Sequence, residues 1–357
     1  MSKPFNVAVI GYGMAAKVFH IPVLTAVPSL RLHAIVQRNP TDSDNAEKDH
    51  PGVKGYRSTE EMVKDPDVDV VVITTIPDTH VALAKLVLNA KKHVLVEKPF
   101  TPTSAEAEEL IQLAKKQGCL ITVYQNRRWD SDFLTASQLI KKGTLGRVAE
   151  FETHFDRFRP EVPTGGSWKN KILPASGAAY DLGTHLIDQV TQLFGLPQKV
   201  TGFVGAQRQG ETYGYEDSCT VLLHYDNGLL ATVKASVISP EKNQLRYWIR
   251  GEKGSYKKHH LDCQEDQLKA GMKPSDSGFA IEPKENHGVL TTVAGNDFKT
   301  EVYPTVKPDT YVEFYKIFAS ALSGKGDVPV KAEQARDVIR LIELARQSSK
   351  EGRTLNV

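Results

Sequence analysis

A glycine-rich turn directly after the first predicted strand constrains the fold of this chain most strongly. Residues 5–10 read Phe-Asn-Val-Ala-Val-Ile, which is typical of a buried strand. Residues 11–16 follow as Gly-Tyr-Gly-Met-Ala-Ala, a G-x-G-x-x-A pattern that opens a helical segment. Gly11 permits a tight turn, Gly13 lets a pyrophosphate approach the backbone, and Ala16 keeps helix and strand close. Pro22 predicts that this helix is short or in two parts.

Strands and helices alternate through the first third of the chain. The apolar runs predict strands, and Thr103 with Glu106 forms a capping box at the start of one helix. Such alternation predicts an α/β unit with a parallel doubly wound sheet. The predicted strands cover residues 5–10, 30–36, 53–56, 68–75, 93–96 and 119–124.

The pattern changes after residue 125, and 357 residues favour two domains. Consecutive strands without intervening helices predict a C-terminal α+β domain with an open, mainly antiparallel sheet. We therefore expect domains at 1–125 and 126–357, with helices over 131–142 and 332–350. The predicted strands cover 148–158, 198–209, 217–225, 229–238, 244–250 and 254–261, and Asp226-Asn227-Gly228 is a hairpin turn between two of them.

Composition limits the partners and the compartment. The net charge of +2 predicts no nucleic-acid surface, and the three cysteines are far apart, as in a reduced cytoplasmic protein. We expect no membrane contact, because no apolar run is long enough to span a bilayer. No closely spaced His/Cys cluster has the spacing of zinc ligands, so we expect no metal site.

A Glu97-Lys98-Pro99 run follows the predicted strand 93–96. Ligands of open α/β sheets bind outside the carboxyl ends of the strands, so Lys98 is placed for chemistry. The alternative is a surface lysine at an ordinary strand end. The Lys-Pro bond is one of the few that could be cis.

The end of the second strand, over 30–36, bears on cofactor choice. An NAD site usually has an acid there, but this strand is followed by Gln37-Arg38-Asn39. An arginine suits the 2′-phosphate of NADP. The alternative is an arginine in a solvated loop with no ligand contact. His80 begins a helix after another strand; it is either a packed helix residue or a neighbour of the dinucleotide.

Asp181 and His185 are four residues apart in a helical segment. They would share a helix face, with Asp181 near the positive end of the helix. The simpler interpretation is one acid–imidazole pair that stabilises the helix.

Three of these features are the G-x-G-x-x-A turn, the run Glu97-Lys98-Pro99 and the pair of Asp181 and His185. Together they resemble the glucose–fructose oxidoreductase/inositol dehydrogenase (Gfo/Idh/MocA) family, over nearly the whole chain. Further matches resemble its NADP-dependent scyllo-inositol dehydrogenase branch; they lie at Gly11-Tyr12-Gly13, Phe19-His20, 126–130, 157–161 and 180–183. The resemblance implies a Rossmann domain, a C-terminal sheet that often forms homodimers, and hydride transfer to or from a sugar or polyol carbon. Two departures are Gly177-Ala178 for the usual Gly-Gly, and Trp168-Lys169 for the usual Trp-Arg.

The resemblance also implies the site residues. Lys98, Asp181 and His185 match the catalytic positions. His185 would exchange the proton of the substrate oxygen and Lys98 would stabilise alkoxide charge, or Lys98 would itself carry the proton. A non-catalytic dinucleotide-binding regulatory protein of the same fold is the alternative. The expected NADP(H) contacts are Gly11, Tyr12, Gly13, Met14, Ala15, Gln37, Arg38, Thr74, Thr75, Pro77, His80, Glu97, Lys98, Asn126, Arg127 and Trp168.

Overall fold

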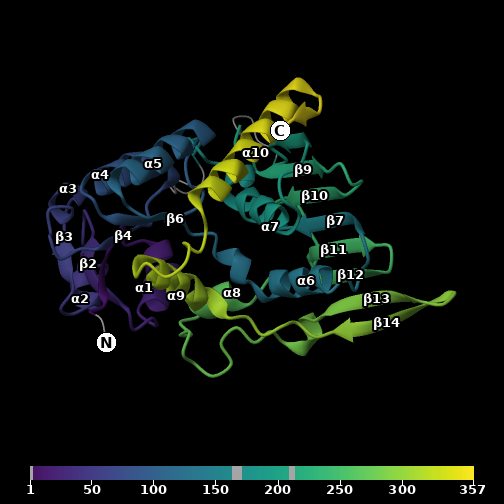
Figure 1. Cartoon of the computed structure of the whole chain (residues 1–357), viewed down its shortest axis with the longest axis horizontal. Coiled ribbons are helices and arrows are strands. Elements are labelled where there is room, and N and C mark those ends of the chain that lie inside the picture. Colours follow the sequence, from purple (N-terminus) through teal and green to yellow (C-terminus); the bar gives the residue numbers. More distant parts are fainter. Residues whose placement is uncertain (1–2, 163–170, 209–213) are drawn as a thin grey trace. The chain divides into compact units, whose positions relative to one another are not determined.

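A computed structural model describes residues 3–162, 171–208 and 214–357 (Figure 1). The chain forms two compact units, and neither is continuous in sequence. The first unit contains Met1–Asn126 together with two later segments, Gln264–Phe279 and Asp309–Arg336. The second unit contains Arg127–Cys263, Ala280–Pro308 and Asp337–Val357. The chain thus returns twice to the first unit after residue 126.

The first unit contains a six-stranded parallel sheet, as the alternation of strands and helices predicts. Its strand order is β3-β2-β1-β4-β5-β6, the order of a Rossmann sheet. The order in which strands are added reverses between β1 and β4, which is the switch point of the sheet. The strands are β1 Phe5–Ile10, β2 Leu30–Val36, β3 Lys54–Tyr56, β4 Val70–Ile73, β5 His93–Val96 and β6 Ile121–Val123.

The helices of the first unit follow their sequence signals closely. The first one is in two parts, a π-helix η1 at Ala15–His20 and then α1 at Ile21–Leu24, with Pro22 in the first turn of α1. Thr103 and Glu106 form the predicted capping box of α5, Ser104–Gln117. The remaining helices are α2 Ala46–Asp49, α3 Thr59–Met62, η2 Pro77–Thr79, α4 His80–Asn89, α8 Gln264–Lys269 and α9 Thr310–Leu322.

Helix α9 comes from the far end of the chain but belongs to the first unit. Its aromatic side chains are buried, and Phe314 makes an edge contact with Tyr124, with ring centroids 4.9 Å apart. Its neighbour Tyr315 is also buried and approaches α1 and η1 through His20. Helix α9 therefore completes the core behind the carboxyl end of β6.

The second unit contains a nine-stranded sheet of order β14-β13-β12-β11-β7-β10-β9-β8-β15. It is mainly antiparallel, as predicted, with one parallel pair between β7 and β10. The six predicted strands are confirmed with slightly shorter ends, whereas β13, β14 and β15 were not expected from the sequence. The strands are β7 Val148–His154, β8 Lys199–Gly205, β9 Ser218–His224, β10 Leu230–Ala235, β11 Leu245–Gly251, β12 Gly254–His259, β13 Gly288–Ala294, β14 Asp297–Tyr303 and β15 Leu355–Asn356.

Helices cover one face of this sheet. A π-helix, η5 at Ala179–Gly183, continues as α7 at Thr184–Phe194 and packs on β9 and β10. Helix α10, Ala332–Glu351, lies against β8 so closely that a Cβ on Gly202 would be 2.0 Å from the carbonyl oxygen of Ala345. The other helical segments are α6 Ser131–Lys141, η3 Asn126–Trp129 and η6 Lys284–Asn286. In the described parts of the chain, every helix is too short or too polar to cross a membrane.

Candidate active site

The glycine turn is located at the switch point of the six-stranded sheet. Gly11 has φ +94°, and a Cβ there would be 3.0 Å from the Oγ1 atom of Thr74 at the end of β4. The fold itself therefore requires a glycine at this position. A Cβ on Gly13, by contrast, would meet nothing within 4 Å. The packing of the chain does not explain Gly13, whereas the approach of a pyrophosphate does, so the turn fits the dinucleotide that the sequence implies.

The loop after β4 is hydrogen-bonded to the end of β1. The hydroxyl of Thr74 donates a hydrogen bond to the carbonyl of Ile10 at 2.9 Å, and the hydroxyls of Thr75 and Thr79 are 2.7 Å apart. Pro77 is buried in the following turn. These contacts hold the backbone of the predicted cofactor loop in one shape.

His80 is fully buried behind this loop. Its Nδ1 atom is 3.0 Å from the carbonyl oxygen of Pro99, and its Nε2 atom is 3.1 Å from that of Thr75. Burial lowers the pKa of His80 and so favours the neutral ring. Of the two interpretations, the geometry favours a packed residue, which would affect a dinucleotide only through the two loops that it connects.

The end of β2 presents one buried and one exposed side chain. Gln37 accepts a hydrogen bond from the backbone N–H of Ala46 at 2.8 Å and donates to the carbonyl of Asp44 at 2.9 Å. Its amide therefore builds the loop beside the turn, while Arg38 is exposed. Tyr12 donates to Asp49 at 2.7 Å, and burial together with this carboxylate raises the pKa of its phenol.

Lys98 is half-buried directly after β5, and its bond to Pro99 is cis. The carboxylate of Glu97 is bound on both sides by protein groups. Its Oε1 atom is 2.8 Å from Nε2 of His20, and its Oε2 atom accepts the backbone N–H of Lys98 at 2.8 Å. Glu97 thus shapes the strand end that presents Lys98. The sequence did not identify His20 as part of this arrangement.

The predicted cofactor residues after β6 are also buried. Asn126 and Arg127 are 7% and 6% exposed. In the second unit, the guanidinium of Arg127 lies 4.8 Å from the ring centroid of Phe155, and its Nη1 atom is 3.1 Å from a carboxylate oxygen of Asp130. Trp168, the last of the predicted contacts, lies outside the described residues. Solvent-facing positions among the predicted contacts include Gly13, Met14 and Arg38.

The Asp181 and His185 pair spans the junction of η5 and α7. Asp181 lies in the π-helical turn and is partly exposed, whereas His185 lies in the α-helical part and is 6% exposed. Short π-helical segments occur frequently at functional sites. Lys98 belongs to the first unit and this pair to the second, so their action on one substrate stays a prediction.

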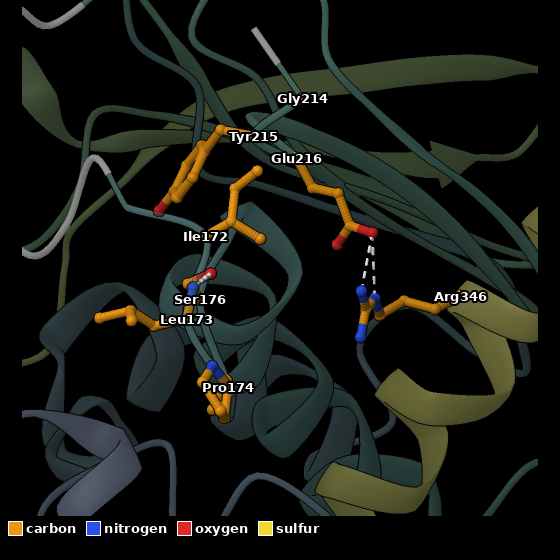
Figure 2. A pocket seen from close by; sticks show the side chains of 9 residues that line it. Ile172, Leu173, Pro174, Ser176, Gly214, Tyr215, Glu216 and Arg346 are labelled. Atoms are coloured by element: carbon orange, nitrogen blue, oxygen red, sulfur yellow. Dashed lines mark hydrogen bonds and ion pairs between the residues drawn. The ribbon is translucent and has the colours of Figure 1, made fainter. Parts of the chain in front are cut away.

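A pocket of about 400 Å³ lies at the start of η5, within the second unit (Figure 2). Glu216 accepts from Nε and Nη2 of Arg346 at 3.1 and 3.0 Å, and the hydroxyl of Tyr215 accepts the N–H of Gly177 at 3.1 Å. These partners are far apart in sequence, and no local pattern would have identified them. Among the described residues, the lining includes neither Asp181 nor His185, so the pocket is separate from the predicted catalytic pair. The lining residues are Ile172, Leu173, Pro174, Ala175, Ser176, Gly214, Tyr215, Glu216 and Arg346.

Comparison with known proteins supports one family for both units. The model of the oxidoreductase family's NAD-binding Rossmann fold matches residues 5–125. The model of the same family's C-terminal alpha/beta domain matches residues 137–357.

Two relatives that are named for an activity are dehydrogenases. The chain is 38% identical to the scyllo-inositol 2-dehydrogenase (NADP(+)) IolW of Bacillus subtilis, over 98% of this chain and 95% of IolW. It is 30% identical to the trans-1,2-dihydrobenzene-1,2-diol dehydrogenase of Bos taurus, over 62% of this chain and 64% of that protein. The solved structure of the oxidoreductase yvaA from Bacillus subtilis superimposes with a TM-score of 0.93 at 37% identity, covering 99% of each chain. From the two family models, the strand order and these relatives, we conclude that the chain belongs to the Gfo/Idh/MocA family of oxidoreductases.

Proposed function

We propose that the protein transfers a hydride between NADP(H) and the hydroxyl-bearing or carbonyl carbon of a sugar or polyol, with an inositol-like ring as the leading candidate. The observation that carries this proposal is the glycine turn at the switch point of the sheet, with open space at Gly13. The NADP(+)-dependent inositol dehydrogenase among the relatives supports the cofactor and the substrate class.

Bound NADP(H) supplies or accepts the hydride. In our proposal the protein manages the proton and the charge on the substrate oxygen. The imidazole of His185 exchanges the proton, since its ordinary pKa lies near neutrality. Asp181 orients the imidazole or holds a neighbouring hydroxyl, and the ammonium of Lys98 stabilises negative charge on the reacting oxygen. The reverse assignment, with Lys98 as the proton carrier, is distinguished by the pH dependence of kcat in the two alanine variants.

A turnover assay tests this proposal directly. Purified protein is mixed with NADP and a panel of inositols, sugars and acyclic polyols, or with NADPH and the corresponding ketones, and nicotinamide absorbance is followed. We expect turnover with at least one ring polyol. Tight NADPH binding without turnover on the whole panel would favour the non-catalytic regulatory alternative.

We predict a preference for NADP(H) that depends on Arg38. A charge-assisted contact to the 2′-phosphate is worth roughly 1.5–3 kcal/mol, so Arg38→Ala should weaken NADP binding about tenfold or more and NAD binding little. The matched control is Arg31→Ala, which removes the same charge from an exposed site at the other end of β2. Calorimetric titration with both nucleotides measures the effect; equal losses for NADP and NAD would remove Arg38 from the phosphate.

We also propose a homodimer or higher homo-oligomer formed through the C-terminal sheet. The hairpin of β13 and β14 pairs Val289 with Val302 and Val293 with Phe298 across its strands. These four side chains share one face and are 39%, 63%, 52% and 71% exposed. Exposed apolar groups gathered in this way mark interaction surfaces.

Two substitutions on β14 test the proposed assembly. Phe298→Asp should shift the protein towards the monomer, because a carboxylate would be buried in the interface. Lys299→Asp places its charge on the opposite face of β14 and should leave the assembly intact. Sedimentation at micromolar concentration measures both variants. A monomeric wild-type protein would contradict the proposed assembly.

A further inference from the structure

Three buried side chains from distant parts of the chain form a hydrogen-bonded line in the first unit. His20 ends η1, Glu97 follows β5, and Tyr315 lies on α9. They are 0%, 9% and 1% exposed. The Nδ1 atom of His20 is 2.6 Å from the hydroxyl of Tyr315, and its Nε2 atom is 2.8 Å from Oε1 of Glu97.

The ionisation of Glu97 determines the direction of its hydrogen bond with His20. Burial alone would raise the pKa of Glu97, but the hydrogen bond and charge of His20, with Lys98, outweigh it and lower that pKa. An ionised carboxylate only accepts, so Nε2 of His20 donates to it. Burial raises the pKa of Tyr315 well above its usual range, so its phenol keeps its proton and shares a hydrogen bond with Nδ1 of His20.

The line ends on the backbone of the predicted catalytic lysine. The second carboxylate oxygen of Glu97, Oε2, accepts the backbone N–H of Lys98 at 2.8 Å. The rotamer of Glu97 is thereby fixed from two sides, by an imidazole and by the next peptide group. Every polar atom in the line from Tyr315 to Lys98 is matched to one partner, which is what a rigid support for a functional group requires.

We propose that His20 and Tyr315 are positioning residues for Lys98, acting through Glu97 to fix the strand end from which the lysine side chain projects. This inference rests on the proposed function, because it takes Lys98 as the group that contacts the substrate oxygen. A misplacement of about 1 Å in such a group can cost on the order of 10²-fold in rate. The line would then affect the chemical step more than cofactor binding.

Other titratable groups also surround the Glu97 carboxylate. Burial lowers the pKa of His80 and raises that of the Tyr124 phenol, so it disfavours the charged form of each group. Lys98 is the adjoining cation along the chain. The titratable groups that act electrostatically on or with Glu97 from the elements packed around it are His20, His80, Lys98, Tyr124 and Tyr315.

The kinetic test compares graded variants in the full-length protein. His20→Leu removes both hydrogen bonds and should lower kcat by roughly 10–100-fold, the value of a hydrogen bond to a charged group. Tyr315→Phe removes one hydroxyl, folds with the same ring in place, and should lower kcat by about 3–10-fold. His20→Gln offers an N–H donor and a C=O acceptor, and should recover much of the loss. NADPH affinity should change by less than about twofold in all three, because none of them contacts the nucleotide in our proposal.

His93→Leu is the matched control. His93 lies at the other end of β5, where its ring accepts the backbone N–H of Leu120 at 2.9 Å. Its loss should lower stability without changing kcat. If His20→Leu and Tyr315→Phe lower thermal stability but leave kcat and its pH profile like those of His93→Leu, the line is only structural and the inference is overturned.

An NMR titration of the Glu97 carboxyl carbon separates this inference from the proposed function. In the wild-type protein Glu97 should remain ionised below the usual glutamate range, and in His20→Leu it should titrate at higher pH because burial then acts without the imidazole. An unchanged titration in His20→Leu overturns the inference even if the protein turns over its substrate. Absence of wild-type turnover on every substrate, with the shift present, overturns the proposed function and leaves the support of Glu97 by His20 established.

Discussion

His185→Ala is expected to lower kcat by about 10²–10⁴, the usual contribution of a positioned acid or base. The imidazole would act on the substrate oxygen, so the affinity for NADPH should barely change. Lys98→Ala should also lower turnover and weaken substrate binding, because the ammonium would contact the same oxygen in the bound substrate and in the transition state. Steady-state kinetics with the best substrate, together with a fluorescence titration of NADPH, measure both quantities.

The stabilising-pair interpretation of Asp181 and His185 makes the opposite prediction. A helix pair four residues apart is worth about 0.2–0.5 kcal/mol, so His185→Ala would then lower Tm slightly and leave kinetics near normal. His224→Ala is the control for removing a histidine from the same unit; it lies on β9, where its Nε2 atom is 2.9 Å from the hydroxyl of Thr201. Near-normal kcat in His185→Ala would remove the catalytic assignment.

Asp188→Ala is expected to destabilise the protein by about 3–5 kcal/mol, because it leaves a guanidinium buried without its carboxylate. Arg128 and Asp188 form a two-pronged pair, with Nε to Oδ2 at 2.8 Å and Nη2 to Oδ1 at 2.6 Å. Both are buried, at 9% and 1% exposed, and Asp188 lies on α7, the helix that carries His185. Denaturant unfolding monitored by circular dichroism gives the change in free energy.

An exposed ion pair provides the control for that experiment. Arg147 and Glu252 pair at 2.9 Å with side chains about half exposed. Exposed pairs contribute about 0–1 kcal/mol, so Glu252→Ala should have a small effect. Similar losses for Asp188→Ala and Glu252→Ala would show that burial does not determine the strength of the Arg128 pair.

Local patterns predicted the elements that local forces determine. The glycine turn, the capping box of Thr103 and Glu106, and the interruption at Pro22 act within a few residues, and the structure confirms all three. The parallel sheet and six strands of the second sheet followed from hydrophobic periodicity in the same way. The Asn227-Gly228 turn joins β9 and β10 in register, with Leu230 opposite His224.

Contacts between distant residues could not be predicted in this way. His20 and Tyr315 are 295 residues apart, and only the return of α9 to the first unit brings them together. Arg246 and Asp132 form another fully buried pair across 114 residues, although arginine and aspartate normally indicate a surface. Strand β14 was missed because the apolar side chains of its hairpin are on the exposed face.

The same difference between local patterns and distant contacts applies to the predicted cofactor residues. Gly11 and Gly13 were predicted from the turn itself, and the structure shows a positive φ at Gly11 and open space at Gly13. Gln37 and Glu97 were predicted from their places at strand ends, but their side chains bind neighbouring protein groups. Position along a strand therefore did not indicate the hydrogen-bond partners of these side chains within the protein.

Deuterium transfer is the most direct test of the central claim. The wild-type protein is incubated with a ketone of the best inositol or sugar and NADPH that carries deuterium at the hydride-donating carbon of the nicotinamide. The account predicts one deuterium on the carbinol carbon of the product, detected by mass spectrometry, and about 10²–10⁴-fold less labelled product with His185→Ala over the same time. Oxidation of the nicotinamide without deuterium in the product, or no reaction with any ring polyol ketone despite tight NADPH binding, would contradict it.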